Sequence, residues 1–443
     1  MQYISTAQQI RRASLAGALL AAMAMPAGAV DLKTADGSWT FSISGNVNVD
    51  YIYSSCQSPD SAASVNGGLT CVGSANSNNV SNIGNGLLPA AFSFGVATTQ
   101  DGIDLAAHLG LYPGIATNDG GSPNLQAGAN GATGSSNTAL GSTGLDLRQV
   151  YMTFGNKSMG TFTLGRNIGL FGSDVILNDM TLLGVGAPGS AAGAAPSNTT
   201  LGGIGFGYIY TDWLAQIDYT TPDFSGFNIT VGIFDPITSL SDVGATQPKK
   251  APGFHAKATW TLPFNDTTKL YLSASFLSQE QDWTVTTGAG PTNYSYTGNG
   301  IDFLAKLDVA DFEVVGYYYH ASGLGTTALF NGGAFDGVDP TTGAVLLGQT
   351  RTSDGYLGQV TYKFGPVKLG VNYGESKLDW ANNADSLVNP DLVSSNKKGT
   401  VGVYYSLTKN LMLLAEASRT KSEAHVGGSN DATTVNVGAF LGF

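Results

Sequence analysis

Charged side chains and long apolar runs are both scarce in this chain. Asp, Glu, Lys and Arg make up 12% of the 443 residues, about half of the roughly 25% that is usual in globular proteins. After residue 29, no stretch approaches the roughly 18 consecutive apolar residues that a membrane-spanning helix needs. These two shortages exclude a helical membrane protein and argue against ordinary soluble domains.

Basic residues are missing from a whole region of the sequence. No Lys or Arg occurs between Lys33 and Arg148, and the chain has a formal net charge of −12. Because nucleic-acid binding depends on clustered Lys and Arg, this charge balance excludes nucleic acid as a partner.

Cysteine and histidine are also rare, with two and four residues respectively. Cys56 and Cys71 have neither CxxC nor other metal-ligand spacing, so we expect no metal and no other cofactor. Both precede the second predicted strand, where export would permit a disulfide; two free thiols are the alternative. The histidines are scattered and no Gly-x-Ser-x-Gly elbow is present, so we expect no enzyme.

The first 29 residues predict a cleaved secretory signal peptide. Arg11 and Arg12 form its basic region, residues 13–25 form its apolar run, and Ala27-Gly28-Ala29 is a small-residue cleavage site. Residues 30–443 are then expected to form one domain.

The sequence is rich in glycine and aromatic residues, and its apolar and polar residues alternate. The chain has 60 glycines, and aromatic residues make up 10%. From Trp39 to Tyr53, aromatic and β-branched residues alternate with Ser, Asn and Asp. A period of two with aromatics at both ends is typical of a transmembrane β-strand, with apolar residues toward lipid and polar residues toward a lumen.

The pattern recurs along the chain and predicts an all-β fold, a transmembrane antiparallel β-barrel of about sixteen strands. Short periplasmic turns of Gly, Pro, Asn and Asp should alternate with long extracellular loops. A soluble β-sandwich would also show alternation, but these strands exceed the usual length of about five or six residues. The predicted strands are 39–53, 89–99, 103–112, 145–154, 160–167, 209–220, 227–234, 253–262, 269–278, 300–309, 312–320, 355–364, 367–375, 399–407, 411–420 and 433–443.

One stretch, residues 165–186, does not alternate. It opens on glycines and carries Asp174 and Asp179 in an otherwise apolar run. We expect this third long loop to fold into the lumen and narrow it. The alternative is a short surface helix, Val175 to Leu183, on an ordinary loop.

In architecture, the whole mature chain resembles the Gram-negative general porins. Residues 160–167 (Gly-Thr-Phe-Thr-Leu-Gly-Arg-Asn) look like the strand that precedes the porin constriction loop, and Leu441-Gly442-Phe443 looks like the outer-membrane assembly signal of that class. The resemblance implies a homotrimer in the outer membrane, assembly machinery that recognises Phe443, contact with lipid and lipopolysaccharide, and passive diffusion of small hydrophilic solutes and ions. The chain departs from the family in lacking a Pro-Glu-Phe-Gly-Gly-type loop motif and a basic ladder on the first strands.

The polar residues that alternate with the apolar ones are expected to point inward and line the pore. They are mostly Ser, Thr, Asn, Gly, Asp and Lys. The charged and imidazole candidates are Asp50, Asp104, His108, Arg148, Arg166, Asp218, Lys257, Asp302, Lys306, Lys363, Lys368 and Glu416.

The acidic balance predicts weak cation selectivity. Fifteen acids stand against four bases between Val30 and Gln247, and rings of charged side chains set pore selectivity. A substrate-specific outer-membrane channel and a surface adhesin or structural barrel are the alternatives. Barrels of about 16–18 strands leave an aqueous channel, which favours the pore.

Overall fold

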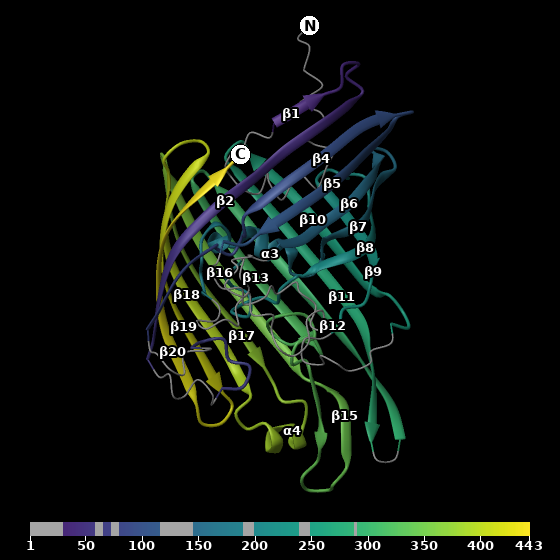
Figure 1. Ribbon diagram of the computed structural model, residues 1–443, viewed down its shortest axis with the longest axis vertical. Helices are drawn as coiled ribbons and strands as arrows, with labels where there is room; N and C mark the ends of the chain where they lie inside the picture. Colours follow the sequence, from purple (N-terminus) through teal and green to yellow (C-terminus); the bar gives the residue numbers. More distant parts are fainter. Residues whose placement is uncertain are drawn as a thin grey trace, which may run out of the picture.

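The computed structural model is a closed antiparallel β-barrel of sixteen strands, which confirms the predicted fold class (Figure 1). The structure describes residues 30–57, 65–71, 79–115, 145–188, 199–238, 249–287 and 290–443. The barrel strands are β2 (Trp39–Cys56), β4 (Ala91–Gln100), β5 (Ile103–Pro113), β6 (Leu145–Asn156), β7 (Gly160–Ile168), β8 (Trp213–Thr220), β9 (Phe227–Phe234), β10 (Gly253–Asn265), β11 (Thr268–Thr287), β12 (Gly290–Val309), β13 (Phe312–Ser322), β16 (Thr352–Phe364), β17 (Val367–Leu378), β18 (Val393–Ser406), β19 (Leu411–Ala424) and β20 (Ser429–Gly442).

The first and last barrel strands close the sheet. β2 pairs with β20 from Asn46, opposite Gly442, to Cys56, opposite Ala432. Two short strands add to the sheet beside β2, namely β1 (Val30–Lys33) and β3 (Asn79–Gly84). Closure leaves no long open edge, and a closed sheet is the only β-structure that satisfies its backbone groups in lipid.

The strands alternate between an outward and an inward set of side chains. On β20, Val435 and Val437 are 46% and 58% exposed, whereas Thr434 and Asn436 are 1% and 3% exposed. The outward set is therefore apolar and faces lipid, and the inward set faces the lumen.

The two ends of the barrel differ, as predicted. Short turns lie at the end where the carboxy-terminus is found (Figure 1). The opposite end carries α4 (Asn383–Val388) and a separate hairpin of β14 (Ala334–Val338) and β15 (Val345–Thr350). β11 and β12 also extend there, paired as far as Thr287 opposite Gly290.

That long hairpin differs from the prediction, which ended the two strands at residues 278 and 300. The extension has a structural reason, because Trp283 stacks between Tyr294 and Tyr296 with ring centroids 5.5 and 5.1 Å away. Cross-strand aromatic pairs of this kind stabilise a hairpin whose remaining residues are polar and loop-like.

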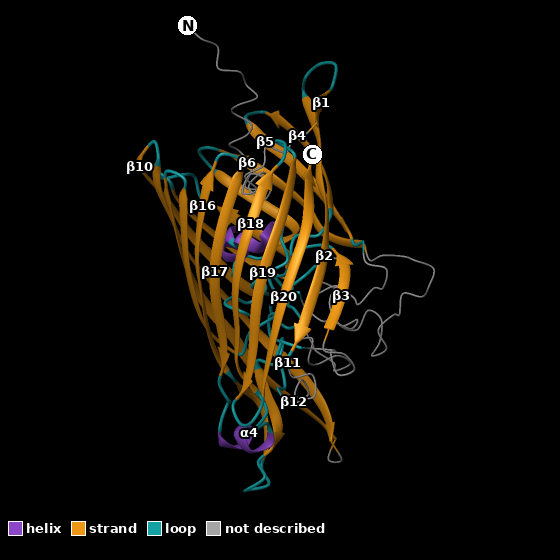
Figure 2. Cartoon of the chain, turned by 90° about the vertical axis from the view of Figure 1, so that its left-hand side faces the viewer, coloured by secondary structure: helices purple, strands orange, loops and turns teal. Residues whose placement is uncertain are grey.

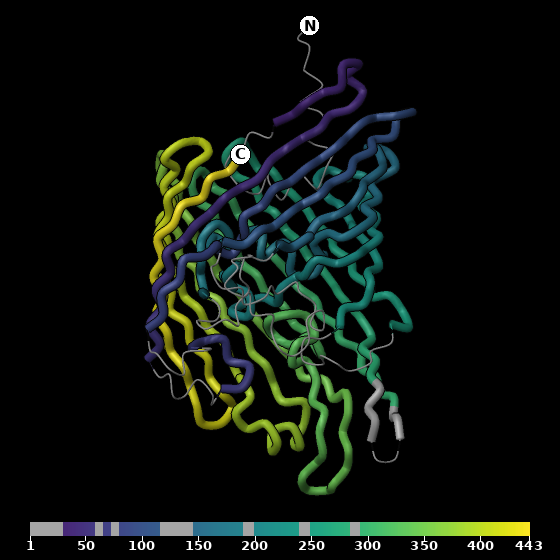
Figure 3. The backbone as a smooth tube through the Cα atoms, viewed as in Figure 1, coloured from purple at the N-terminus to yellow at the C-terminus, as the bar shows by residue number. Residues whose placement is uncertain are grey.

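Inside the barrel lies the described part of the chain between β7 and β8, residues 169–188 and 199–212, which we call the inward loop. It contains α3 (Ser173–Asn178) and the 3-10 helix η3 (Met180–Leu183). Figure 2 shows this helical segment enclosed by the strands, and Figure 3 traces the same chain through the interior. Its inward position confirms the prediction over the surface-helix alternative. No helix in the described part of the chain is long and apolar enough to cross a membrane.

Candidate functional site: the barrel lumen

The inward loop begins where Gly172 turns the chain into α3. Gly172 has φ 73°, a left-handed conformation that glycine adopts without steric cost. Its amide donates to Asp302 Oδ2 on β12 at 2.7 Å, and a Cβ at this position would lie 2.8 Å from the Ile209 carbonyl oxygen. A glycine is therefore required where the loop leaves β7 and meets the opposite wall.

Asp174, the first predicted loop acid, is bonded to the opposite wall. Lys257 Nζ on β10 lies 3.0 Å from Asp174 Oδ1, and the Tyr271 hydroxyl on β11 donates to Oδ2 at 2.8 Å. Its charge is thus opposed by a lysine rather than directed into open water.

Asp179, the second predicted loop acid, caps η3. Its Oδ1 accepts from the Thr181 amide at 2.9 Å and from Asn372 Nδ2 of β17 at 3.2 Å. Its Oδ2 accepts from the Tyr208 hydroxyl at 2.8 Å. This carboxylate, 4% exposed, connects the two limbs of the loop with the wall.

Glu416 and Gln359 hold the middle of the loop. Glu416 Oε2 accepts from the amides of Val185 and Gly186 at 2.8 and 2.9 Å. Gln359 accepts from the Met180 amide at 2.6 Å and donates to the Asn178 carbonyl at 2.9 Å. Hydrogen bonds to charged groups contribute about 1.5–3 kcal/mol each, so Glu416 is a principal anchor.

A second segment, residues 85–90, enters the lumen beside the loop. The Leu87 amide donates to the Gly184 carbonyl at 2.7 Å, and the Leu88 amide donates to the Leu182 carbonyl at 3.0 Å. Asn48 on β2 donates to the Leu88 carbonyl at 2.9 Å. Alternation does not predict this backbone pairing, because it places residues 55–87 in a long extracellular loop between two strands.

Apolar packing also fixes the loop, at a part of the lumen wall that the prediction of mostly polar residues does not include. Phe171, Val175 and Ile209 of the loop are fully buried. They pack in one cluster with inward wall residues such as Leu304 and Leu357. The loop therefore covers apolar as well as polar wall residues, and burying each large apolar side chain contributes about 1.5–3 kcal/mol.

The other pore-lining candidates mostly lie on the inward set. Asp50 accepts from Asn436 at 3.0 Å, and Asp218 lies 2.8 Å from His255 Nε2. Arg148 pairs with Asp146 at 3.1 Å, an acid that the prediction missed. Asp104 is also inward and is exposed near a short turn, and the inward His108 stacks on Tyr151. The remaining inward candidates are lysines on β12, β16 and β17, namely Lys306, Lys363 and Lys368.

The prediction is wrong for Arg166. Its register partners are Val150 on β6 and Ala215 on β8, both on the outward set. The inward positions of β7 are held by Thr161, Thr163, Gly165 and Asn167, and Asn167 Oδ1 accepts from the buried Gln149 at 3.0 Å.

A family model described as Gram-negative porin matches residues 16–425. The chain belongs to the Gram-negative porin family. Family and fold together make it an integral outer-membrane β-barrel and an outer-membrane channel.

Solved structures of outer-membrane proteins share the fold of this porin. The outer membrane channel DcaP of Acinetobacter baumannii has 15% identity and a TM-score of 0.64, covering 93% of this chain and 99% of its own. The anion-selective porin from Comamonas acidovorans has 13% identity and a TM-score of 0.54, covering 91% and 100%. Salmonella typhi OmpF, in a complex with daunomycin, has 13% identity and a TM-score of 0.50, covering 94% and 100%. No protein of curated function matches the sequence.

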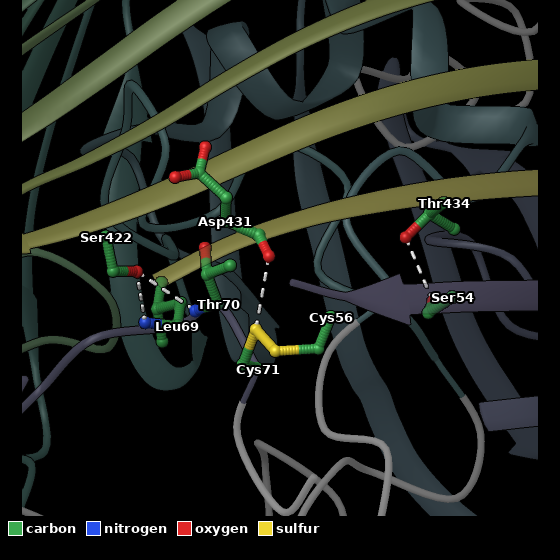
Figure 4. Close-up of a disulfide and its surroundings, with 8 residues drawn as sticks. All are labelled: Ser54, Cys56, Leu69, Thr70, Cys71, Ser422, Asp431 and Thr434. Carbon is green, nitrogen blue, oxygen red and sulfur yellow. Dashed lines mark hydrogen bonds between the residues drawn. A yellow bond between two sulfur atoms is a disulfide. The ribbon is translucent and has the colours of Figure 1, made fainter. Parts of the chain in front are cut away.

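In this porin, the disulfide between Cys56 and Cys71 holds a second extracellular segment, residues 65–71 (Figure 4). The two Cα atoms are 5.5 Å apart. The amides of Leu69 and Thr70 each donate to the Ser422 hydroxyl of β19 at 3.0 Å. The disulfide therefore ties the first loop to the inner wall on the extracellular side.

Lys398 is a lumen residue that sequence reasoning missed. It is fully buried on the inward set of β18, opposite Gly374 and Thr420. The predicted strand began at residue 399, one position later, so the alternation was never extended to it. Among the described residues, no group of three or more His, Cys, Asp or Glu side chains could hold a metal ion.

Proposed function

We propose that this porin is a passive diffusion channel for small hydrophilic solutes and ions, with weak cation selectivity. The observation that carries the proposal is the inward loop, which crosses the lumen and is hydrogen-bonded to β12, β16, β17 and β19. A loop held on several sides narrows the lumen without closing the barrel at its ends.

Charge around the inward loop supports the cation preference. Among the described residues, carboxylates outnumber lysines there, because Lys257, Lys306 and Lys398 accompany six acids that lie on the loop or on the wall beside it. These acids are Asp50, Asp174, Asp179, Asp218, Asp302 and Glu416. A narrow lumen with low-dielectric walls focuses the field of such charges and concentrates cations.

Reversal potential in a KCl gradient across a planar bilayer tests the selectivity. We expect the sign of a cation-preferring channel, and the double variant Asp174→Asn, Asp179→Asn should shift the potential toward anions. The shift should shrink as salt rises, because salt screens the charges. Asp223→Asn in the β8–β9 turn is the matched control, since Asp223 is exposed and outside the lumen.

Either of two results would contradict the proposal. An anion-selective sign in the wild type would mean that the lumen lysines dominate the acids. A correctly folded protein without conductance would favour the alternative of a surface adhesin or structural barrel.

The imidazole contacts give no support to catalysis. In the described residues, His255 bonds to Asp218, His320 to Asp354 and His425 to the Leu378 carbonyl. Nucleophilic catalysis needs a histidine beside a hydroxyl or thiol, and none of these three hydrogen bonds supplies one. We therefore propose a channel and not an enzyme.

The partners of this porin are also proposals. We propose a homotrimer because the porin family implies one. The oligomeric state of the protein in detergent tests this proposal. Contact with outer-membrane lipid and lipopolysaccharide is supported by the extracellular rim of the outward face. There Lys397 pairs with Glu423 at 2.5 Å and Arg419 with Asp431 at 3.4 Å. Lys and Arg at this level attract anionic head groups, and mass spectrometry of co-purified lipid tests the contact.

A further inference from the structure

Two lysines lie directly opposite each other on the β16–β17 hairpin. Lys363 is the cross-strand partner of Lys368, and both are on the inward set. Like charges placed directly opposite are destabilising in an antiparallel pair. The pair therefore lowers the stability of the folded barrel, and strand pairing alone gives no reason for its presence.

The four lysines predicted to line the pore differ in their ion pairs. Lys257 is paired with Asp174 at 3.0 Å, and Lys306 is paired with Glu313 at 2.6 Å. Lys363 and Lys368 have no ion-pair partner in the part of the chain that the structure describes. Glu416, the acid on the neighbouring wall, is occupied by the Val185 and Gly186 amides.

The surroundings of Lys368 leave its ammonium able to bind a further group. Its Nζ lies 5.2 Å from the ring centroid of Tyr404. A cation–π contact engages one side of the ammonium and leaves its N–H donors for other acceptors. Lys363 is exposed, so a small solute can reach the pair from the lumen.

The pair lies on the periplasmic side of the inward loop. Gly370, two residues beyond Lys368 along β17, faces η3 so closely that a Cβ there would lie 2.7 Å from Met180 Sδ. In the other direction, the hairpin turns at Gly365 and Pro366, at the short-turn end of the barrel. A solute entering from the periplasm thus meets the lysines before it meets the loop.

We propose that Lys363 and Lys368 bind a small divalent oxyanion at the periplasmic entrance of the lumen. Two ammonium groups can neutralise two negative charges and donate to several oxygen atoms at once. The site deepens the proposed function, on which it rests, by naming a ligand class. It also adds an asymmetry, because an anion should reach a site below an acidic constriction from the periplasmic side and not from the extracellular side.

Sulfate added to one side of a planar bilayer tests the site, because it stays divalent across the working pH range. At constant ionic strength, periplasmic sulfate should reduce single-channel KCl current in a saturable way, and extracellular sulfate should not. Losing one ammonium about 4 Å from a charge in a wet site removes about 1 kcal/mol, so Lys363→Gln or Lys368→Gln should raise the half-blocking concentration about fivefold. Lys409→Gln, in the β18–β19 turn at the same end, is the matched control and should change nothing.

Chemical footprinting gives a readout that does not depend on conductance. In detergent-folded protein, sulfate should protect Lys363 and Lys368 from acetylation, measured by mass spectrometry, while Lys409 remains unprotected. Equal block from both sides, unchanged block in both lysine variants or absence of protection would overturn the site, even in a conducting channel. A folded protein that does not conduct but shows protection would overturn the proposed function and leave the site standing.

Discussion

Asp385 shows how a single carboxylate fixes an extracellular loop. Arg351 binds it through two hydrogen bonds, Nε to Oδ2 at 2.8 Å and Nη2 to Oδ1 at 2.7 Å. The Ala381 amide and Asn389 Nδ2 add two more at 2.9 and 2.7 Å. Burial alone would raise the pKa of Asp385, but the Arg351 guanidinium and the Ala381 amide outweigh it and hold this pKa below the ordinary 3.8.

The direction of that shift predicts how the loop responds to acid. A lowered pKa in the folded state contributes stability above the ordinary pKa, and this contribution is lost as pH falls through the lowered value. We therefore expect α4 to stay docked at pH 3.8 and to be released only in stronger acid. NMR of carboxyl-labelled aspartates should give a midpoint below 3.8 for the resonance that disappears in Asp385→Asn. A midpoint above that value would mean that burial outweighs the ion pair.

The inward loop depends on its docking rather than on its own helices. α3 has six residues and η3 has four, and helices this short are unstable alone in water. Their apolar side chains, such as Val175 and Leu182, belong to the lumen cluster shared with the wall. The loop therefore depends on the barrel wall for its structure, whereas the barrel strands pair with one another and not with the loop.

Deleting Ser173 to Leu183 should consequently widen the pore. We expect single-channel conductance to rise while the protein remains heat-modifiable on gels, because the deleted residues form no strand pairs. Deleting Thr341 to Ala344 in the β14–β15 hairpin, outside the lumen, is the control and should leave conductance unchanged. A folded loop deletion with wild-type conductance would show that this segment does not limit flow.

Strand positions are predictable from the sequence because most lipid-facing residues have polar or small neighbours on either side. Arg166 is misplaced in the prediction, because Thr163 is inward and a period of two from it puts Arg166 on the outward set. The apolar lumen patch around Leu304 and Leu357 was missed because both of its halves come from distant parts of the chain. Periodicity carries no information about which inward positions another segment will cover.

The complete barrel depends on the strand that joins its two ends. Phe443 exchanges hydrogen bonds with Gly45 at 2.8 and 2.9 Å, and its ring packs on Phe92 with centroids 5.6 Å apart. Such an aromatic pair contributes about 0.5–1.5 kcal/mol beyond its buried area. This is a modest share of the stability of a sheet of this size.

Phe443→Ala should therefore separate assembly from stability. If the assembly machinery recognises Phe443, outer-membrane yield in cells should fall severalfold, while refolding into detergent gives an SDS-resistant, heat-modifiable oligomer like the wild type. Phe264→Ala, at the exposed end of β10 beside the β10–β11 turn, should keep both yields. A variant that refolds poorly in detergent would assign Phe443 a structural role instead.

The pairing of β1 means that the two ends of the described chain lie in one line along β2. Val30 is opposite Ile43, and Phe443 bonds with Gly45, so only position 44 separates them. A peptide link from Phe443 to Val30, with the segment before Val30 removed, would make the backbone circular. New termini could then be opened in the β14–β15 hairpin, and such a circular permutant would have the same wall with a different strand made last.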